Sequence, residues 1–231
     1  MAQSVFHIHV AEQVKEVDEI ESHYGVRPVE WLLENLGVNE KWCLVHATHM
    51  TEQETLNLSK TGAVAGLCPI TESNLGDGVF NGQSYLRWDG KFGIGTDSNI
   101  RISLCEELRM LEYSQRLKHK ARAVLSKSGM STGRSLFDAI TLGGSQALMR
   151  NSGSLQAGMF ADILVLDTDC VDLVDRVDDD ILDCFIFAGN NDMVSEVWSA
   201  GRQVIKEGQH IHHSEITQRY LATIKQLNLS L

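Results

Sequence analysis

The stretch Val5-Phe6-His7-Ile8-His9 is a short, β-rich run that ends in a histidine, and the chain repeats this pattern. Trp42 to His46 is a second apolar run closed by a histidine, and Lys91 to Gly95 is followed by Thr96 and Asp97. Ala63 to Leu67 is a fourth run of the same kind. Segments with helical spacing of apolar residues lie between these runs, so the first part of the chain predicts four strand-helix units.

Strands joined by crossover helices predict a parallel sheet. The carboxyl ends of its strands would meet at one edge, where His9, His46 and Asp97 would lie together. In a (β/α)8 barrel this edge carries the catalytic groups. A doubly wound open sheet has the same rhythm, so periodicity alone leaves barrel and open sheet as alternatives.

The character of the chain changes after about residue 150. Residues 152–158 read as a turn-rich link, Ala161 to Asp167 as a strand, and Val194 to Lys206 as a hairpin around Gly201-Arg202. The Asp-rich stretch from Asp172 to Asp183 reads as a solvated loop. We therefore expect three parts: the strand-helix part in 1–150, a small β layer in 151–212 and a C-terminal helix in 213–231.

Composition limits the function classes. The 231 residues are 43% hydrophobic and 22% charged, as in an ordinary globular protein. A net charge of -11 speaks against nucleic acid as a partner, and no apolar stretch reaches the roughly 20 residues of a membrane helix. Five scattered cysteines without a CxxC pair fit a reducing, cytoplasmic location. A small molecule is the expected partner.

Four residues of the predicted edge can carry metal or proton chemistry: His9, Glu12, His46 and Asp97. Histidine and carboxylate side chains bind a divalent metal, which makes a nucleophile from water at neutral pH. Acid and base groups beside the metal can then move protons. Each residue alone is more simply structural, but three such strand ends on one sheet edge favour a site.

Four segments that include these residues resemble the signatures of strands five to eight in amidohydrolase-superfamily deaminases. The third one, with its run from Thr71 to Gly78, resembles the formimidoylglutamate deiminases in particular. The segments are His7-Ile-His-Val-Ala-Glu-Gln13, Leu44-Val-His-Ala-Thr-His49, Gly66-Leu-Cys-Pro-Ile-Thr-Glu-Ser-Asn-Leu-Gly-Asp-Gly78 and Gly93-Ile-Gly-Thr-Asp-Ser-Asn99.

The resemblance implies an α/β fold: the C-terminal half of a (β/α)8 barrel, then a small β-sandwich layer and a C-terminal helix. It implies one zinc ion, with His9 as a metal ligand and Asp97 as a metal contact that also takes a proton. Glu12 would shuttle protons to the substrate nitrogen, and His46 would polarise the zinc-activated water. Two more ligands, a His-x-His pair, would come from an N-terminal half that this chain lacks.

The implied activity is zinc-dependent hydrolysis of N-formimidoyl-L-glutamate to N-formyl-L-glutamate and ammonia, a step of histidine degradation. This chain alone should be inactive, and the full-length form should be a homodimer. Two alternatives stay open. One is a deaminase of an aminated heterocycle such as guanine or a triazine, against which the Asn74 to Gly78 loop argues. The other is a non-catalytic fragment, which the missing strands favour.

Other polar residues receive weaker expectations. Glu72, Asn74 and Asp77 are expected to shape the pocket, His7 to be structural, and His49 has no assigned role. Half a barrel would also leave the strand at Val5 to Val10 and the one at Lys91 to Gly95 without a neighbour on one side.

Overall fold

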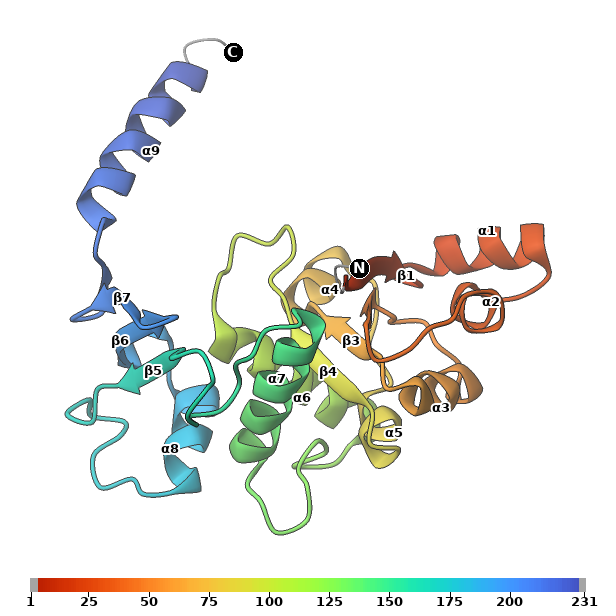
Figure 1. Cartoon of the computed structure of the whole chain (residues 1–231), viewed down its shortest axis with the longest axis horizontal. Coiled ribbons are helices and arrows are strands. Elements are labelled where there is room, and N and C mark those ends of the chain that lie inside the picture. Colours follow the sequence, from red (N-terminus) through yellow and green to blue (C-terminus); the bar gives the residue numbers. More distant parts are fainter. Residues whose placement is uncertain (1–3, 229–231) are drawn as a thin grey trace.

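The computed structural model describes residues 4–228 and contains two four-stranded sheets (Figure 1). The first half of the chain holds the parallel sheet and most of the helices. Its elements are β1 (Phe6–Val10), α1 (Val14–Tyr24), α2 (Pro28–Asn35), β2 (Trp42–His46), α3 (Glu52–Thr61), β3 (Val64–Leu67), α4 (Pro69–Leu75), α5 (Gly82–Arg87), β4 (Lys91–Ile94), α6 (Leu104–His119) and α7 (Thr132–Ala147).

The rest of the chain holds the second sheet and further helical elements. Its elements are β5 (Ile163–Leu166), α8 (Asp179–Asp183), a π-helical turn (Cys184–Ala188), a 3-10 turn (Asn191–Met193), β6 (Val194–Ser199), β7 (Arg202–Lys206), β8 (Gln209–His210) and α9 (His213–Asn228). The four strands predicted in the first part of the chain are confirmed, with ends that differ by at most one residue.

The first sheet has the strand order β1-β2-β3-β4, and every pairing is parallel. Leu44, Ala65 and Phe92 share one face of it and belong to the main core, together with apolar side chains of the helices. His9 and Val45 share the opposite face. The carboxyl ends of the strands lie at one edge, which is where the candidate site residues follow.

Local sequence signals account for the helix ends. Thr51 and Glu54 form a capping box at the start of α3, and Gly62 ends that helix in the left-handed conformation. Pro28 and Pro69 occupy the first turns of α2 and α4, where a missing N–H has no cost. Helix α1 ends at Gly25, which adopts a φ of 75°, so α1 and α2 are two separate helices.

Helix α7 covers the outer side of β4, the last strand of the parallel sheet. Its residues Leu136 and Ile140 pack in the core on one face of the sheet, while Ala147 packs against Cys43 and Val64 on the other. The helix therefore crosses β4 from one face to the other, and a Cβ atom on Gly143 would lie 1.9 Å from the carbonyl oxygen of Phe92. As predicted, β4 pairs with no strand on this side, but α7 packs beside it.

The Asp-rich stretch was predicted to be a solvated loop, but its last residues are helical. It forms the short helix α8, whose acidic residues bind the start of α7: the backbone N–H of Ser131 donates to Asp179 and that of Gly133 to Asp183. Negative side chains at a helix N-terminus satisfy N–H groups that have no partner within the helix.

The second sheet is antiparallel with the order β5-β6-β7-β8, and β6 and β7 form the predicted hairpin. After it, α9 extends away from both sheets (Figure 1), and none of its described side chains is buried. No helix within residues 4–228 is long and apolar enough to cross a membrane. The division of the chain at 150 and 212 stays a prediction.

Candidate functional site

The turn after β1 places His9 and Glu12 at the carboxyl edge of the sheet. Ala11 turns the chain with a φ of 51°, in the left-handed region. The Glu16 carboxylate holds this turn, because it accepts from the backbone N–H of Ala11 at 2.7 Å and from that of Glu12 at 2.9 Å. These two hydrogen bonds fix the backbone position of Glu12 just after the end of β1.

The end of β2 places His46 beside them. His46 and Ala47 both adopt left-handed backbone conformations, with φ of 66° and 48°. Such conformations are costly outside glycine and persist where the surroundings impose them. Here the N–H groups of Ala47 and His49 donate to the carbonyl oxygens of Val10 and Ala11, so the two strand ends are bonded to each other.

His9, Glu12 and His46 form a cluster whose potential ligand atoms lie within 4.8 Å of one another. His46 Nε2 is 3.7 Å from Glu12 Oε1, and the two imidazole rings meet edge to face with centroids 5.0 Å apart. His46 is fully buried, Glu12 is partly buried and His9 is exposed. Two imidazoles and a carboxylate at this spacing are a donor set that suits a divalent metal or proton transfer.

Glu72, on α4, is the second contact of His46. Its Oε1 lies 3.4 Å from His46 Nδ1 and also accepts from the backbone N–H of Cys68 at 2.9 Å. The other ring nitrogen, Nε2, is buried without a hydrogen-bond partner. The sequence suggested only that Glu72 shapes the pocket.

The charges in the cluster alter the protonation of its members. Burial alone would lower the pKa of His46, but the hydrogen bond with Glu72 and the charges of Glu12, Glu72 and Asp97 together raise it. Burial, with the nearby carboxylates of Asp77 and Asp97, raises the pKa of Glu12 against the opposing effect of the two histidines. Both shifts favour the protonated form of these groups.

Asp97 does not join this cluster within the described residues 4–228. Its side chain is exposed and its backbone is left-handed, with a φ of 51°. Its charge nevertheless raises the pKa of both Glu12 and His46, so it faces the same edge. Three of the four predicted site residues are thus brought together, and the fourth lies close by.

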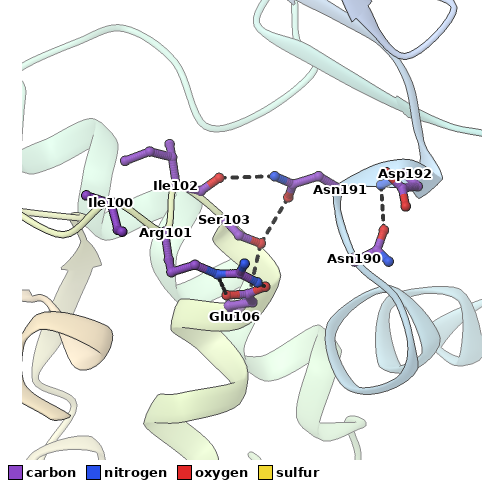
Figure 2. Close-up of a pocket in the computed structure, with 8 residues that line it drawn as sticks. All are labelled: Ile100, Arg101, Ile102, Ser103, Glu106, Asn190, Asn191 and Asp192. Carbon is purple, nitrogen blue, oxygen red and sulfur yellow. Dashed lines mark hydrogen bonds and ion pairs between the residues drawn. The ribbon is translucent and has the colours of Figure 1, made fainter. Parts of the chain in front are cut away.

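The loop after Asp97 is tied to the second sheet. Figure 2 shows the side chain of Asn191, which precedes β6, reaching across to this loop. Its amide donates to the carbonyl oxygen of Ile102 and accepts from the hydroxyl of Ser103, both at 3.0 Å. A cavity of about 280 Å³ lies between the two segments. Arg101 points to Glu106 in this cavity, and the two form an ion pair.

The remaining polar residues have structural partners. His7 Nε2 donates to the carbonyl oxygen of Ala147 at 2.8 Å, in line with its expected structural role. His49 Nε2 donates to the carbonyl oxygen of Asp77 at 2.7 Å, a contact that no sequence signal indicated. The Asp77 carboxylate accepts from Gln13 at 3.0 Å, whereas Asn74 is exposed.

Comparison with known proteins decides the family. A family model described as the amidohydrolase family matches residues 1–204. The chain belongs to the amidohydrolase family. The resemblance that the strand-end motifs indicated is confirmed, and so is the mixed α/β fold.

Two curated relatives are deaminating or deiminating enzymes. Formimidoylglutamate deiminase of Pseudomonas aeruginosa is 44% identical over 222 residues, which cover 96% of this chain and 49% of the deiminase. The 5-methylthioadenosine/S-adenosylhomocysteine deaminase of Pyrococcus abyssi is 30% identical over 168 residues, which cover 71% of this chain and 38% of the deaminase. The chain thus spans about half the length of the curated relatives it matches, or less.

Solved amidohydrolase structures agree with the fold. One from Brucella melitensis superposes with a TM-score of 0.91 at 45% identity, over 97% of this chain and 49% of that one. An adenosine deaminase from Xanthomonas campestris, solved with bound zinc, superposes with a TM-score of 0.82 at 26% identity, over 95% of this chain and 49% of that one.

Proposed function

We propose that this chain is the C-terminal half of an iminohydrolase that converts N-formimidoyl-L-glutamate and water to N-formyl-L-glutamate and ammonia, a step of histidine degradation. The cluster of His9, Glu12 and His46 at the strand ends carries the proposal. The 44% identity to a formimidoylglutamate deiminase, against 30% to a deaminase of an aminated purine nucleoside, favours the imine substrate over a heterocycle.

The donor set fits a single zinc ion. His9 and Asp97 would hold it, with two further ligands from the N-terminal half of the protein. When bound, zinc lowers the pKa of a water molecule to about 7, which supplies the nucleophile. The buried Nε2 of His46 has no partner in the described part of the chain and faces the same cluster, as a group that contacts a metal-bound ligand should.

The residues of this chain would then move the protons. Asp97, exposed at the edge, accepts a proton from the attacking water. Glu12, whose pKa is raised by burial, carries a proton to the substrate nitrogen so that ammonia can leave. His46 orients the reacting oxygen through Nε2.

The four parallel strands would be strands five to eight of a (β/α)8 barrel, and the second sheet would be part of a small β-sandwich layer. The five cysteines are all unpaired, which supports a reducing, cytoplasmic location. We expect the full-length form to be a homodimer that acts on a small molecule, with no nucleic acid or membrane as partner.

Reconstitution tests this function. The chain alone should release no ammonia from N-formimidoyl-L-glutamate at enzymatic rates of roughly 1 to 1000 per second. Co-expression with the N-terminal half of the Pseudomonas aeruginosa deiminase should restore zinc binding and turnover. Turnover by this chain alone would contradict the half-site, and a folded, zinc-loaded complex that is inert on this substrate would contradict the substrate.

Two matched variants of the reconstituted protein separate the roles at the end of β1. Glu12→Gln should keep zinc and lower turnover by at least about 100-fold, as loss of acid-base catalysis does. His9→Ala should lose zinc, measured by metal analysis after gel filtration. Zinc lost from Glu12→Gln but kept by His9→Ala would reverse the two assignments.

A further inference from the structure

A carboxylate behind His46 is the feature that the proposed chemistry leaves unused. Glu72 is 4% exposed and sits in the first turn of α4, directly after β3. Its Oε1 accepts from the Cys68 N–H at 2.9 Å, which fixes the carboxylate in place. The same oxygen lies 3.4 Å from His46 Nδ1, on the side of the ring that faces away from Glu12.

We propose that Glu72 is a positioning residue that fixes the tautomer of His46, with hydrogen on Nδ1 and the lone pair of Nε2 facing Glu12 and the reacting groups. This inference rests on the proposed function for its catalytic meaning, but the tautomer itself belongs to the chain alone. A neutral imidazole donates from one nitrogen and accepts at the other, and the hydrogen bond at one decides the role of the other.

Two carboxylates compete for the ring hydrogen. If it were on Nε2, it would point to Glu12 Oε1, 3.7 Å away and on a partly exposed side chain. On Nδ1 it points to Glu72, which is nearer, buried and held by a backbone N–H. A desolvated acceptor in a fixed position gains more from the hydrogen bond than a solvated one. Nε2 therefore remains an acceptor, and no donor among the described residues reaches it.

The chain offers a matched control in Glu107 of α6. Its carboxylate is as buried as that of Glu72 and binds the start of the same helix, α4, accepting from the backbone N–H of Ile70 at 2.9 Å. Unlike Glu72, it makes no hydrogen bond or ion pair with His46. A general loosening of the start of α4 would follow from either substitution, whereas the tautomer should respond only to Glu72.

Nitrogen-15 NMR of the purified chain, labelled in its histidine rings, tests the tautomer without metal or substrate. The His46 signals are identified by their loss in His46→Asn. At a pH where the ring is neutral, we expect a protonated Nδ1 and an unprotonated Nε2. The opposite pattern in the unaltered chain overturns the proposal, whatever the variants do.

The variants then locate the cause. Glu72→Met removes the acceptor and should move the population toward hydrogen on Nε2. Glu72→Gln keeps an oxygen for the Cys68 N–H and for Nδ1, so it should keep the original tautomer, and Glu107→Met should keep it too. The proposal is overturned if folded Glu72→Met keeps the original tautomer, or if Glu107→Met changes the tautomer equally. If Glu72→Met does not fold, a changed tautomer in Glu72→Gln overturns the proposal.

In the reconstituted enzyme, Glu72→Met should lower kcat by about 10- to 100-fold, the range typical of residues that orient a site through another residue, with KM and zinc content unchanged. The two proposals fail separately. An inactive, zinc-loaded complex with hydrogen on His46 Nδ1 contradicts the proposed function and leaves the positioning role of Glu72 intact.

Discussion

At the scale of single residues, Glu107 makes the free energy of unfolding depend on pH. Burial, with the charges of Glu72 and Glu106, raises its pKa from 4.5 to about 7, although the Ile70 N–H lowers it. The folded state therefore holds the proton more tightly than the unfolded state does. The resulting stability is fully present below pH 4.5, is lost as pH rises toward 7, and amounts to about 3 kcal/mol.

We expect Glu107→Gln to remove this dependence, because the amide keeps an acceptor for Ile70 and carries no charge. Urea unfolding at pH 4.5 and pH 8 measures it. The free energy of unfolding of the variant relative to the unaltered chain should rise by about 3 kcal/mol between the two values. If the variant and the unaltered chain differ by the same free energy of unfolding at pH 4.5 and pH 8, Glu107 is already ionised in the folded protein at acidic pH.

The sequence predicted the residues of the candidate site better than their contacts. His9, Glu12 and His46 could be found because each follows a β-rich run, and parallel strands bring such positions together. The pairing of His46 with Glu72 could not be found, because it depends on where the first turn of α4 lies relative to the end of β2. The one available signal for this contact was the position of Glu72, three residues after Pro69 and so in the first turn of α4.

At the scale of elements, the packing of α7 on β4 depends on two adjacent glycines with different surroundings. A Cβ on Gly143 would meet the Phe92 carbonyl at 1.9 Å, whereas a Cβ on Gly144 would have no atom within 4 Å. Gly143 therefore allows a helix and a strand backbone to touch, and Gly144 points into open space.

We expect Gly143→Ala to destabilise the chain by at least about 1 to 3 kcal/mol, because helix and strand must separate. Gly144→Ala should be neutral or stabilise by up to about 1 kcal/mol, since alanine favours the helix. Midpoints of urea unfolding compare the two. Equal effects would mean that α7 does not press on β4 as described.

The elements themselves followed from local signals, while the role of α7 did not. Thr51 with Glu54 caps the start of α3, and Gly25 ends α1 in the left-handed conformation, as these residue types commonly do. Nothing in the spacing of α7 indicated that it crosses β4, because the pattern of a helix shows which side is apolar but not what it covers. Likewise, Asp179 and Asp183 read as loop residues until their contacts with the start of α7 were seen.

At the scale of the whole molecule, β1 is the side of the parallel sheet that stays open. It pairs with β2 alone, and Phe6, which stacks on Trp42 with ring centroids 5.0 Å apart, is still 53% exposed. A groove of about 230 Å³ lined by Ile8, Val10 and apolar residues of α1 and α2 continues from it. An apolar strand with unpaired backbone groups recruits other chains.

We therefore expect the purified chain to self-associate through β1, into a dimer or soluble aggregates larger than 25.7 kDa. Phe6→Lys places a charge on the open strand and should shift light scattering toward the monomer. The matched control is Tyr220→Lys on α9, a residue that is 63% exposed on the helix extending from the molecule, and it should leave association unchanged. If Tyr220→Lys dissociates the chain and Phe6→Lys does not, α9 is the associating element. If the unaltered chain is already a monodisperse monomer, the β1 side is protected in solution. Addition of the proposed N-terminal half should abolish association at β1, because a strand of the proposed barrel would then pair with it.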